Sequence, residues 1–167
     1  MEQSPPYSKT RVNAQGKLWR DGQTYNREII NSVLVFYADV VEELIRVIDR
    51  SIKHLSLPVT DRGAGEVLPD SKPYILTARV KTAATLLEKL RRMGNTPLLN
   101  VQDIAGIRFD CDLTLTEQRQ VANLFAEDLR LEGATRVDIK DYLDSPHSGY
   151  RAVEPNPTQA DISAIRL

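Results

Sequence analysis

The chain has 167 residues, of which 41% are hydrophobic and 27% charged, as in ordinary globular domains. A domain of this length buries roughly 68–70% of its unfolded surface, so a single core accounts for the whole chain. The 22 basic and 23 acidic residues give a formal net charge of −1. This balance excludes an overall field that would draw the molecule to nucleic acid or to an anionic membrane.

The N-terminus and the cysteine content indicate a reducing compartment. Residues 1–6 lack the positive start and apolar run of a signal peptide, and no stretch approaches the roughly 20 apolar residues of a membrane span. Cys111 is the only cysteine, which excludes an internal disulfide and a cysteine-based zinc site, and we expect it to be a small core hydrophobe. We therefore expect a cytoplasmic protein.

The N-terminal part of the chain is expected to contain an arm followed by one long helix. Residues 1–24 are polar, include Pro5-Pro6 and Asp21-Gly22, and show no sustained hydrophobic period, which predicts a loosely held arm. Between residues 25 and 55, apolar residues recur at steps of three and four, which predicts a long amphipathic helix. These residues are Ile30, Val33, Leu34, Tyr37, Val41, Leu44, Ile45, Ile48, Ile52 and Leu55.

Strands and helices are predicted to alternate along the rest of the chain. Residues 58–73 are rich in Pro and Gly and predict a loop, 74–80 predict a short strand, and 82–93 predict a second helix ended by Gly94-Asn95.

The same alternation continues through the following segment. Residues 104–111 predict a strand, and Thr114 and Glu117 have the spacing of a capping box that begins a helix ended by Gly133. Residues 135–139 predict a third, half-exposed strand. This order predicts an α+β domain, with a sheet flanked by helices and preceded by a long N-terminal helix.

A polar row on the predicted helix 82–93 is a candidate polyphosphate site. Lys81, Thr85, Lys89 and Arg92 follow one another at steps of four, four and three, so they lie on one side of the helix, starting at its N-terminus. The free amides there carry partial positive charge, and Arg79 projects from the preceding strand to the same side. A solvated helix face with Glu88 paired to Arg92 is the alternative.

The predicted strand 104–111 begins and continues with residues that suit a nucleotide. Asp103 stands at its mouth, where one carboxylate can hold Mg²⁺ together with substrate phosphates, although a lone Asp there is also an ordinary turn residue. Gly106 allows a ligand or another backbone to come close. Arg108 either contacts a phosphate or pairs with a structural carboxylate such as Asp110.

The polar loop near residue 150 is a candidate base-binding segment. Tyr150 follows Ser148-Gly149 and could stack on a nucleobase, with Lys140, His147 or Arg151 near its phosphates. A tyrosine that anchors the loop to the core is the alternative. His54 and His147 lack the neighbours of a metal cluster, so we assign them no zinc or manganese role.

Four short patches occur in a fixed order along the chain. They are Arg79-Val80-Lys81 before a helix, Asp103-Ile104-Ala105-Gly106-Ile107-Arg108, Lys140-Asp141-Tyr142, and Gly149-Tyr150-Arg151-Ala152-Val153. In this order and spacing they resemble the nucleotide site of the RelA/SpoT-type alarmone synthetases, over close to half the chain. The His-Asp motif of the family's hydrolase domain does not occur in these 167 residues, so we expect the small, synthesis-only type.

The resemblance implies a fold and an activity. The fold would be a nucleotidyltransferase-like mixed sheet flanked by helices, in a domain that spans residues 25–153. The activity would be that of a GTP diphosphokinase, which transfers the pyrophosphate of ATP to the 3′-hydroxyl of GDP or GTP, with Mg²⁺ as cofactor. Such transfer depends on positioning and charge neutralisation more than on covalent chemistry by the protein.

The resemblance also implies roles for individual residues. Asp103 would be the catalytic residue that binds Mg²⁺. Lys140, His147 and Tyr150 would bind GDP or GTP, with His147 in place of a more usual lysine and Tyr150 stacked on guanine. The residues that would bind ATP are Arg79, Lys81, Thr85, Lys89 and Arg108.

The sequence departs from the family pattern after Val153. The family has a histidine where this chain has Glu154, and residues 161–166 match only faintly the Glu-x-Gln-x-Arg pattern whose Glu completes the metal site. We therefore expect a synthetase shortened at its C-terminus, inactive or strongly impaired, with residues 154–167 as a disordered tail.

Two other functions are considered. The first is a non-catalytic nucleotide-binding or regulatory module, either a homo-oligomer or associated with an intact synthetase subunit through an exposed sheet edge. A nucleic-acid binder is less favoured, because the basic residues form only a local patch and the aromatic content is 6%.

Overall fold

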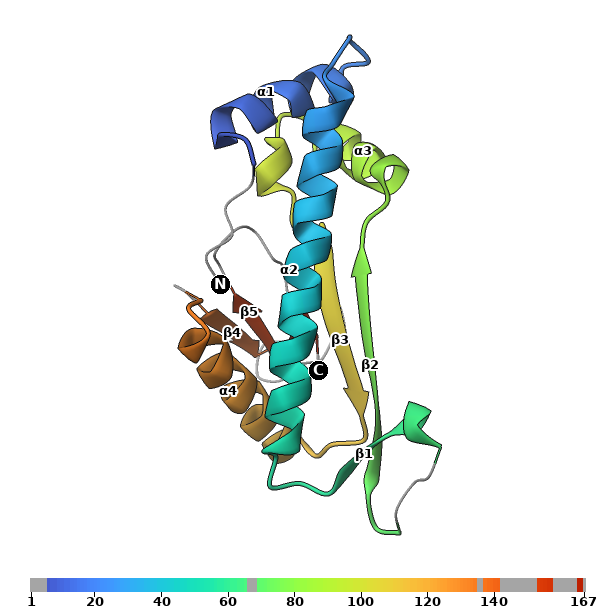
Figure 1. Cartoon of the computed structure of the whole chain (residues 1–167), viewed down its shortest axis with the longest axis vertical. Helices are drawn as coiled ribbons and strands as arrows, with labels where there is room; N and C mark the ends of the chain where they lie inside the picture. The colour runs from blue at the N-terminus through green and yellow to red at the C-terminus, as the bar shows by residue number, and fades with distance from the viewer. Residues whose placement is uncertain (1–5, 66–68, 135–136, 142–152, 158–164, 167) are drawn as a thin grey trace.

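The computed structural model describes residues 6–65, 69–134, 137–141, 153–157 and 165–166. Helices and strands alternate along the chain, as expected for an α+β domain (Figure 1). The helices are α1 (Lys9–Arg20), α2 (Arg27–Lys53), α3 (Ala83–Arg92) and α4 (Leu115–Leu131), with short 3₁₀ turns η1 (Arg62–Ala64) and η2 (Leu98–Asn100). The strands are β1 (Val59–Asp61), β2 (Lys72–Val80), β3 (Ala105–Cys111), β4 (Val137–Asp141), β5 (Val153–Pro157) and β6 (Ile165–Arg166).

The described strands form two sheets. The larger has the order β1-β2-β3-β6, and it is mixed because β2 and β3 are antiparallel while β1 and β6 join their neighbours in parallel. The smaller sheet pairs β4 with β5 in antiparallel fashion. A mixed sheet flanked by helices and preceded by a long helix confirms the predicted fold class.

The long helix α2 organises the core. It runs along the sheet, packs on β2 and β3, and has α4 beside it (Figure 1). Asn26 caps its N-terminus by accepting hydrogen bonds from the amides of Glu28 and Ile29, and its predicted apolar stripe is buried almost throughout. Leu44 and Ile48 are among its fully buried residues.

An aromatic chain ties the sheet to α4. The ring of Phe109 on β3 lies 5.2 Å from that of Tyr74 on β2 and 5.7 Å from that of Phe125 on α4, the latter edge-on. Such tilted and edge-on arrangements are favoured between aromatic rings. The predicted capping box of α4 is also present, since Thr114 and Glu117 bond to each other's backbone amides.

Three predictions of unstructured segments are wrong. Residues 9–20 of the expected arm form helix α1, which Ser8 caps and which buries Val12, Gly16 and Trp19. Spaced by four and three, these residues form one narrow face, but only two of them are apolar, so no hydrophobic period is visible. Within the expected loop 58–73, β1 pairs in parallel with β2, and its three residues are too few to be recognised between prolines and glycines.

The third correction concerns part of the expected disordered tail, whose residues 158–164 and 167 lie outside the described residues. Residues 153–157 form β5 beside β4, and residues 165–166 form β6 beside β3. Pro155 and Pro157 lie within β5, because proline is tolerated in a strand whose amides are not all needed for pairing. Among the described residues, no helix is long and apolar enough to cross a membrane.

Candidate functional site

The antiparallel pairing of β2 and β3 brings two predicted motifs together. Arg79 lies opposite Gly106, and Val80 lies opposite Ala105. The ladder continues beyond the strands, since the Lys81 amide donates to the Ile104 carbonyl over 2.7 Å. The end of the Arg79-Val80-Lys81 motif therefore adjoins the residue that follows Asp103.

The two faces of the β2–β3 ribbon differ in character. Ala105, Ile107 and Phe109 alternate toward the core and are buried, whereas Arg108 and Arg79 are exposed on the opposite face. Gly106, opposite Arg79, adds no side chain to that face. The backbone is therefore accessible beside the Arg79 guanidinium, as close approach by a ligand requires.

One of the two predicted partners of Arg108, the carboxylate of Asp110, lies beside it in the structure. Its Nε donates to Oδ1 of Asp110 over 2.7 Å, and both side chains are exposed. Exposed pairs of this kind are weak. Arg108 is therefore held along β3 by its neighbour, while a role in binding ATP stays a prediction.

Helix α3 begins beside the end of β2 and carries the polar row. Thr82 is the N-cap, and its Oγ1 accepts a hydrogen bond from the Thr85 amide over 3.3 Å. The hydroxyls of Thr82 and Thr85 lie 3.0 Å apart, so Thr85 is held at the helix start. Leu86 and Leu90 bury the opposite side of the helix.

Lys89 and Asp103 meet in the structure. The Lys89 ammonium lies 3.2 Å from Oδ2 of Asp103 and also donates to the main-chain carbonyl of Gln102. The Lys89 side chain is 15% exposed and that of Asp103 is 39% exposed, so the pair lies at the rim of the fold with its carboxylate toward solvent. Asp103 has a left-handed backbone with φ of 61°, a conformation in which Asp is enriched among non-glycine residues.

The oxygen atoms at this position suit a hard cation. The carboxylate of Asp103 and the carbonyl of Gln102 converge on a single cationic group, the ammonium of Lys89. Mg²⁺ prefers such oxygen ligands and is usually held by one or two carboxylates together with substrate phosphates. No group of three or more His, Cys, Asp and Glu side chains that could hold a metal by itself occurs in the described part of the chain.

The predicted guanine-nucleotide residues lie mostly outside the described residues. The backbone of Lys140 belongs to β4, where it pairs with Glu154 of β5. His147 and Tyr150 fall in the segment 142–152, which is not described. The structure describes the side chains of the other predicted site residues, which lie on or next to β2, α3 and β3: Arg79, Lys81, Thr85, Lys89, Asp103 and Arg108.

Helix α1 supports this site, and this contact was not predicted from the sequence. The segment between Lys89 and Asp103 passes under α1, where Asn13 accepts a hydrogen bond from the Leu99 amide over 3.0 Å and Gly16 abuts Leu98. The Asn13 and Gly16 spacing and the Ser8 cap were the available signals. Helix α1 therefore packs on the connection that joins the two members of the ion pair, Lys89 and Asp103.

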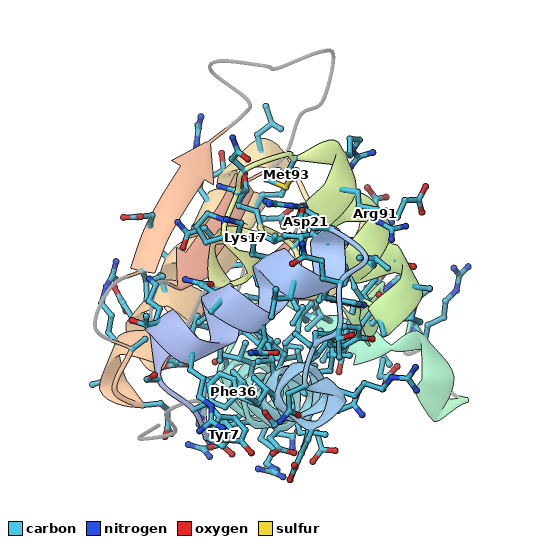
Figure 2. All side chains as sticks on the ribbon, turned by 90° about the horizontal axis from the view of Figure 1, so that it is seen from above. Tyr7, Lys17, Asp21, Phe36, Arg91 and Met93 are labelled. Atoms are coloured by element: carbon cyan, nitrogen blue, oxygen red, sulfur yellow. The ribbon has the colours of Figure 1, made fainter. Side chains whose placement is uncertain are left out.

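Two arginines link the C-terminal ends of α1 and α3, each through a hydrogen bond to a backbone carbonyl at the other helix end. Nε of Arg91 donates to the Arg20 carbonyl over 3.2 Å, and the Arg20 guanidinium donates to the Gly94 carbonyl and pairs with Asp21. Figure 2 shows Lys17, Asp21 and Arg91 gathered at this junction. The Arg20 hydrogen bond keeps the pKa of Asp21 below its ordinary value, and the cationic side chains complement the partial negative charge of the two helix ends.

A marked pKa shift lies away from this cluster. The Lys72 ammonium, 2.6 Å from Glu117, together with the backbone and hydroxyl of Thr114, lowers the pKa of Glu117 to about 2. Burial raises the pKa of the Cys111 thiol, which packs half-buried against the core and therefore stays protonated. These groups are structural.

Among known proteins, no family model matches the chain. It is 36% identical over 151 residues to uncharacterized proteins of Mycobacterium bovis and Mycobacterium tuberculosis, a match that covers 89% of this chain and 48% of each relative. The chain thus spans about half the length of the curated relatives it matches. It is also similar to the crystal structure of small alarmone synthetase 1 from Bacillus subtilis, with 27% identity, a TM-score of 0.47, and coverage of 80% of this chain and 64% of that one.

Proposed function

We propose that this chain binds ATP and a guanine nucleotide and belongs functionally with the RelA/SpoT-type synthetases, as an ATP:GDP/GTP 3′-pyrophosphotransferase. The observation that carries the proposal is the meeting of Lys89 with Asp103 at the end of β2, where Arg79 faces Gly106. Arg79 belongs to the first patch of the ordered motif set and Lys89 to the helix that follows it, whereas Asp103 and Gly106 belong to the second patch. A shared polyphosphate and metal site requires residues of both patches to lie close together.

The described residues support a division of labour within that site. Arg79, Lys81 and Lys89 would bind the phosphates of ATP, because phosphoryl-type transfer is promoted mainly by positioning and by neutralising charge. Asp103 would hold Mg²⁺, which when bound supplies further neutralisation of the phosphate oxygens. Lys140, His147 and Tyr150 are proposed for GDP or GTP on the basis of the sequence motifs.

We expect low turnover. The motif residues include one metal-binding carboxylate, Asp103, and the residues after Tyr150 do not follow the pattern that provides the second. Loss of a single electrostatic contact used in a transition state typically lowers kcat by about 10²–10³. The predicted product is therefore guanosine tetra- or pentaphosphate formed slowly.

A specific observation favours a second candidate, the non-catalytic nucleotide-binding module. Lys89 pairs with the carboxylate of Asp103, so the proposed metal ligand is already neutralised by a side chain in the nucleotide-free fold. A protein of this kind would bind nucleotide without transferring pyrophosphate, and it could act as a homo-oligomer or with a synthetase subunit.

One experiment separates these functions. The chain is incubated with γ-labelled ATP, Mg²⁺ and GDP or GTP, and products are resolved chromatographically, while nucleotide binding is measured by calorimetry. Labelled guanosine polyphosphate that disappears in Asp103→Asn supports the synthetase. Heat of nucleotide binding without product supports the module, and neither heat nor product rejects both.

A further inference from the structure

The ammonium of Lys89 lies against two oxygen atoms of the kind that bind divalent cations. It contacts Oδ2 of Asp103 and the carbonyl of Gln102, two oxygen atoms that belong to consecutive residues. Both are ligands of the type that Mg²⁺ accepts. A cationic side chain there repels a metal ion and uses the lone pairs that would bind it.

Both partners are held from opposite sides. Lys89 extends from α3, whose Leu86 and Leu90 are buried, and the Lys81–Ile104 hydrogen bond fixes the chain just after Asp103. The lysine stem itself is long and flexible, so its ammonium can change position while helix α3 stays in place. The carboxylate is the more exposed partner, so a ligand reaches the pair from its side.

We propose that Lys89 acts as an exchange cation that couples nucleotide binding to metal binding. In the nucleotide-free protein, Lys89 occupies the oxygens of Asp103 and Gln102 and keeps a divalent cation out. When a nucleotide polyphosphate binds, Lys89 moves to the phosphate oxygens, and the vacated oxygens accept the Mg²⁺ that accompanies the nucleotide. This inference rests on the proposed function and adds an order of events to it.

The charges favour this order. A partly exposed ion pair between one lysine and one carboxylate contributes little stability, so giving it up costs little. A polyphosphate carries several negative charges and accepts stronger hydrogen bonds than a single carboxylate oxygen, so it competes well for the ammonium. The net charge near Asp103 becomes more negative when Lys89 leaves, which attracts the metal.

Mn²⁺ binding to the nucleotide-free protein tests the exchange, with electron paramagnetic resonance reporting the free ion. Replacing Lys89 with Met or with Gln should lower the Mn²⁺ dissociation constant at least about threefold relative to the unmodified chain. Lys89→Arg retains a cation and should bind Mn²⁺ as weakly as the unmodified chain. The gain should vanish in the double variant Lys89→Met/Asp103→Asn.

A matched variant controls for net charge. Arg62→Met removes one positive charge from an exposed position of η1, outside the candidate site, and it should leave Mn²⁺ affinity unchanged. Calorimetric titration with metal-free ATP completes the test, and Lys89→Met should bind ATP about tenfold more weakly than the unmodified chain.

The outcomes are distinguishable. Equal Mn²⁺ affinity of the unmodified chain and both uncharged Lys89 variants overturns the exchange, even where ATP binds. A gain that also appears in Arg62→Met, or that survives in the double variant, overturns it as well. Absence of ATP binding by the unmodified chain overturns the proposed function together with the nucleotide trigger, whatever Mn²⁺ does.

Discussion

Gly16 of α1 lies so close to Leu98 of η2 that a Cβ atom at position 16 would come within 2.5 Å of the Leu98 Cβ. Contacts of that length do not occur between real side chains, and the Leu98 Cβ is fixed to the backbone. Helix and turn must therefore separate if position 16 carries a side chain. Because Gly16 has no side chain, α1 can pack directly on the connection between α3 and β3.

Gly16→Ala is expected to destabilise the protein by about 1–3 kcal/mol, the usual range for overpacking. The sign is informative, because the same change in an unconstrained helix interior stabilises by roughly 0.5–1 kcal/mol. Urea unfolding followed by circular dichroism measures the difference in free energy of unfolding. Ala14→Gly, at an exposed position of α1, reports helix propensity alone. A Gly16→Ala protein more stable than the unmodified chain would show that α1 does not pack this closely.

Ser51 links α2 to α4 and gives a second stability prediction. Ser51 is fully buried, and its hydroxyl bonds to the Val47 carbonyl and to the carboxylate of Asp128. Ser51→Ala should lower the free energy of unfolding by about 1–3 kcal/mol, because Asp128 loses a hydrogen bond in a partly buried place. Ser32→Ala is the control, since the Ser32 hydroxyl donates to the Ile29 carbonyl within α2 itself. Equal effects of both changes would argue against the α2–α4 link.

Glu117 gives the protein a predicted acid sensitivity. Its pKa is lowered from 4.5 to about 2 by the Lys72 ammonium and the Thr114 cap. A carboxyl whose pKa falls on folding stabilises the fold fully above its unfolded pKa, and the contribution is lost as the pH falls toward the folded pKa. The loss should therefore occur between pH 4.5 and about 2, as the start of α4 separates from the start of β2.

Glu117→Gln tests this window. The variant should be less stable than the unmodified chain at neutral pH, and the two should converge as the pH falls below 4.5, because the unmodified chain loses the same interaction on protonation. Thermal melting across this pH range measures the difference. Glu127→Gln, an exposed change on the same helix, should leave the pH dependence parallel to that of the unmodified chain. A difference between Glu117→Gln and the unmodified chain that stays constant with pH would contradict the prediction.

The elements with a strong hydrophobic period were predictable, and the ones held by tertiary contacts were not. The stripe of α2 and the cap of α4 are local signals, and both appear where the sequence places them. Helix α1 has only Val12 and Trp19 as apolar anchors with Gly16 between them, so its burial depends on Leu98 and α2, which are distant in sequence. Strands β1 and β6 are short and gain their structure from β2 and β3.

The candidate site was partly predictable for the same reason. The spacing of Lys81, Thr85 and Lys89 follows from helix geometry, and strand pairing then places Asp103 beside that row. The ion pair between Lys89 and Asp103 was not predicted. The polar row was expected to face a ligand, and the alternative was a solvated helix face with Glu88 paired to Arg92. The left-handed backbone of Asp103 was also not visible, because a lone Asp before a strand has many conformations.

Arg79 provides the most direct test of the proposed polyphosphate face. Its guanidinium is exposed opposite Gly106, which leaves room for a phosphate beside it, and a planar guanidinium can bind phosphate through paired hydrogen bonds. Arg79→Gln should weaken ATP binding about tenfold in calorimetry, the size expected for losing a charge-assisted contact. Thermal stability should change little because the side chain lies on the face away from the core. Arg62→Gln, an exposed arginine of η1 outside the motif, should bind ATP like the unmodified chain. If both variants lose the same affinity, attraction by general positive charge explains binding better than a phosphate contact at Arg79.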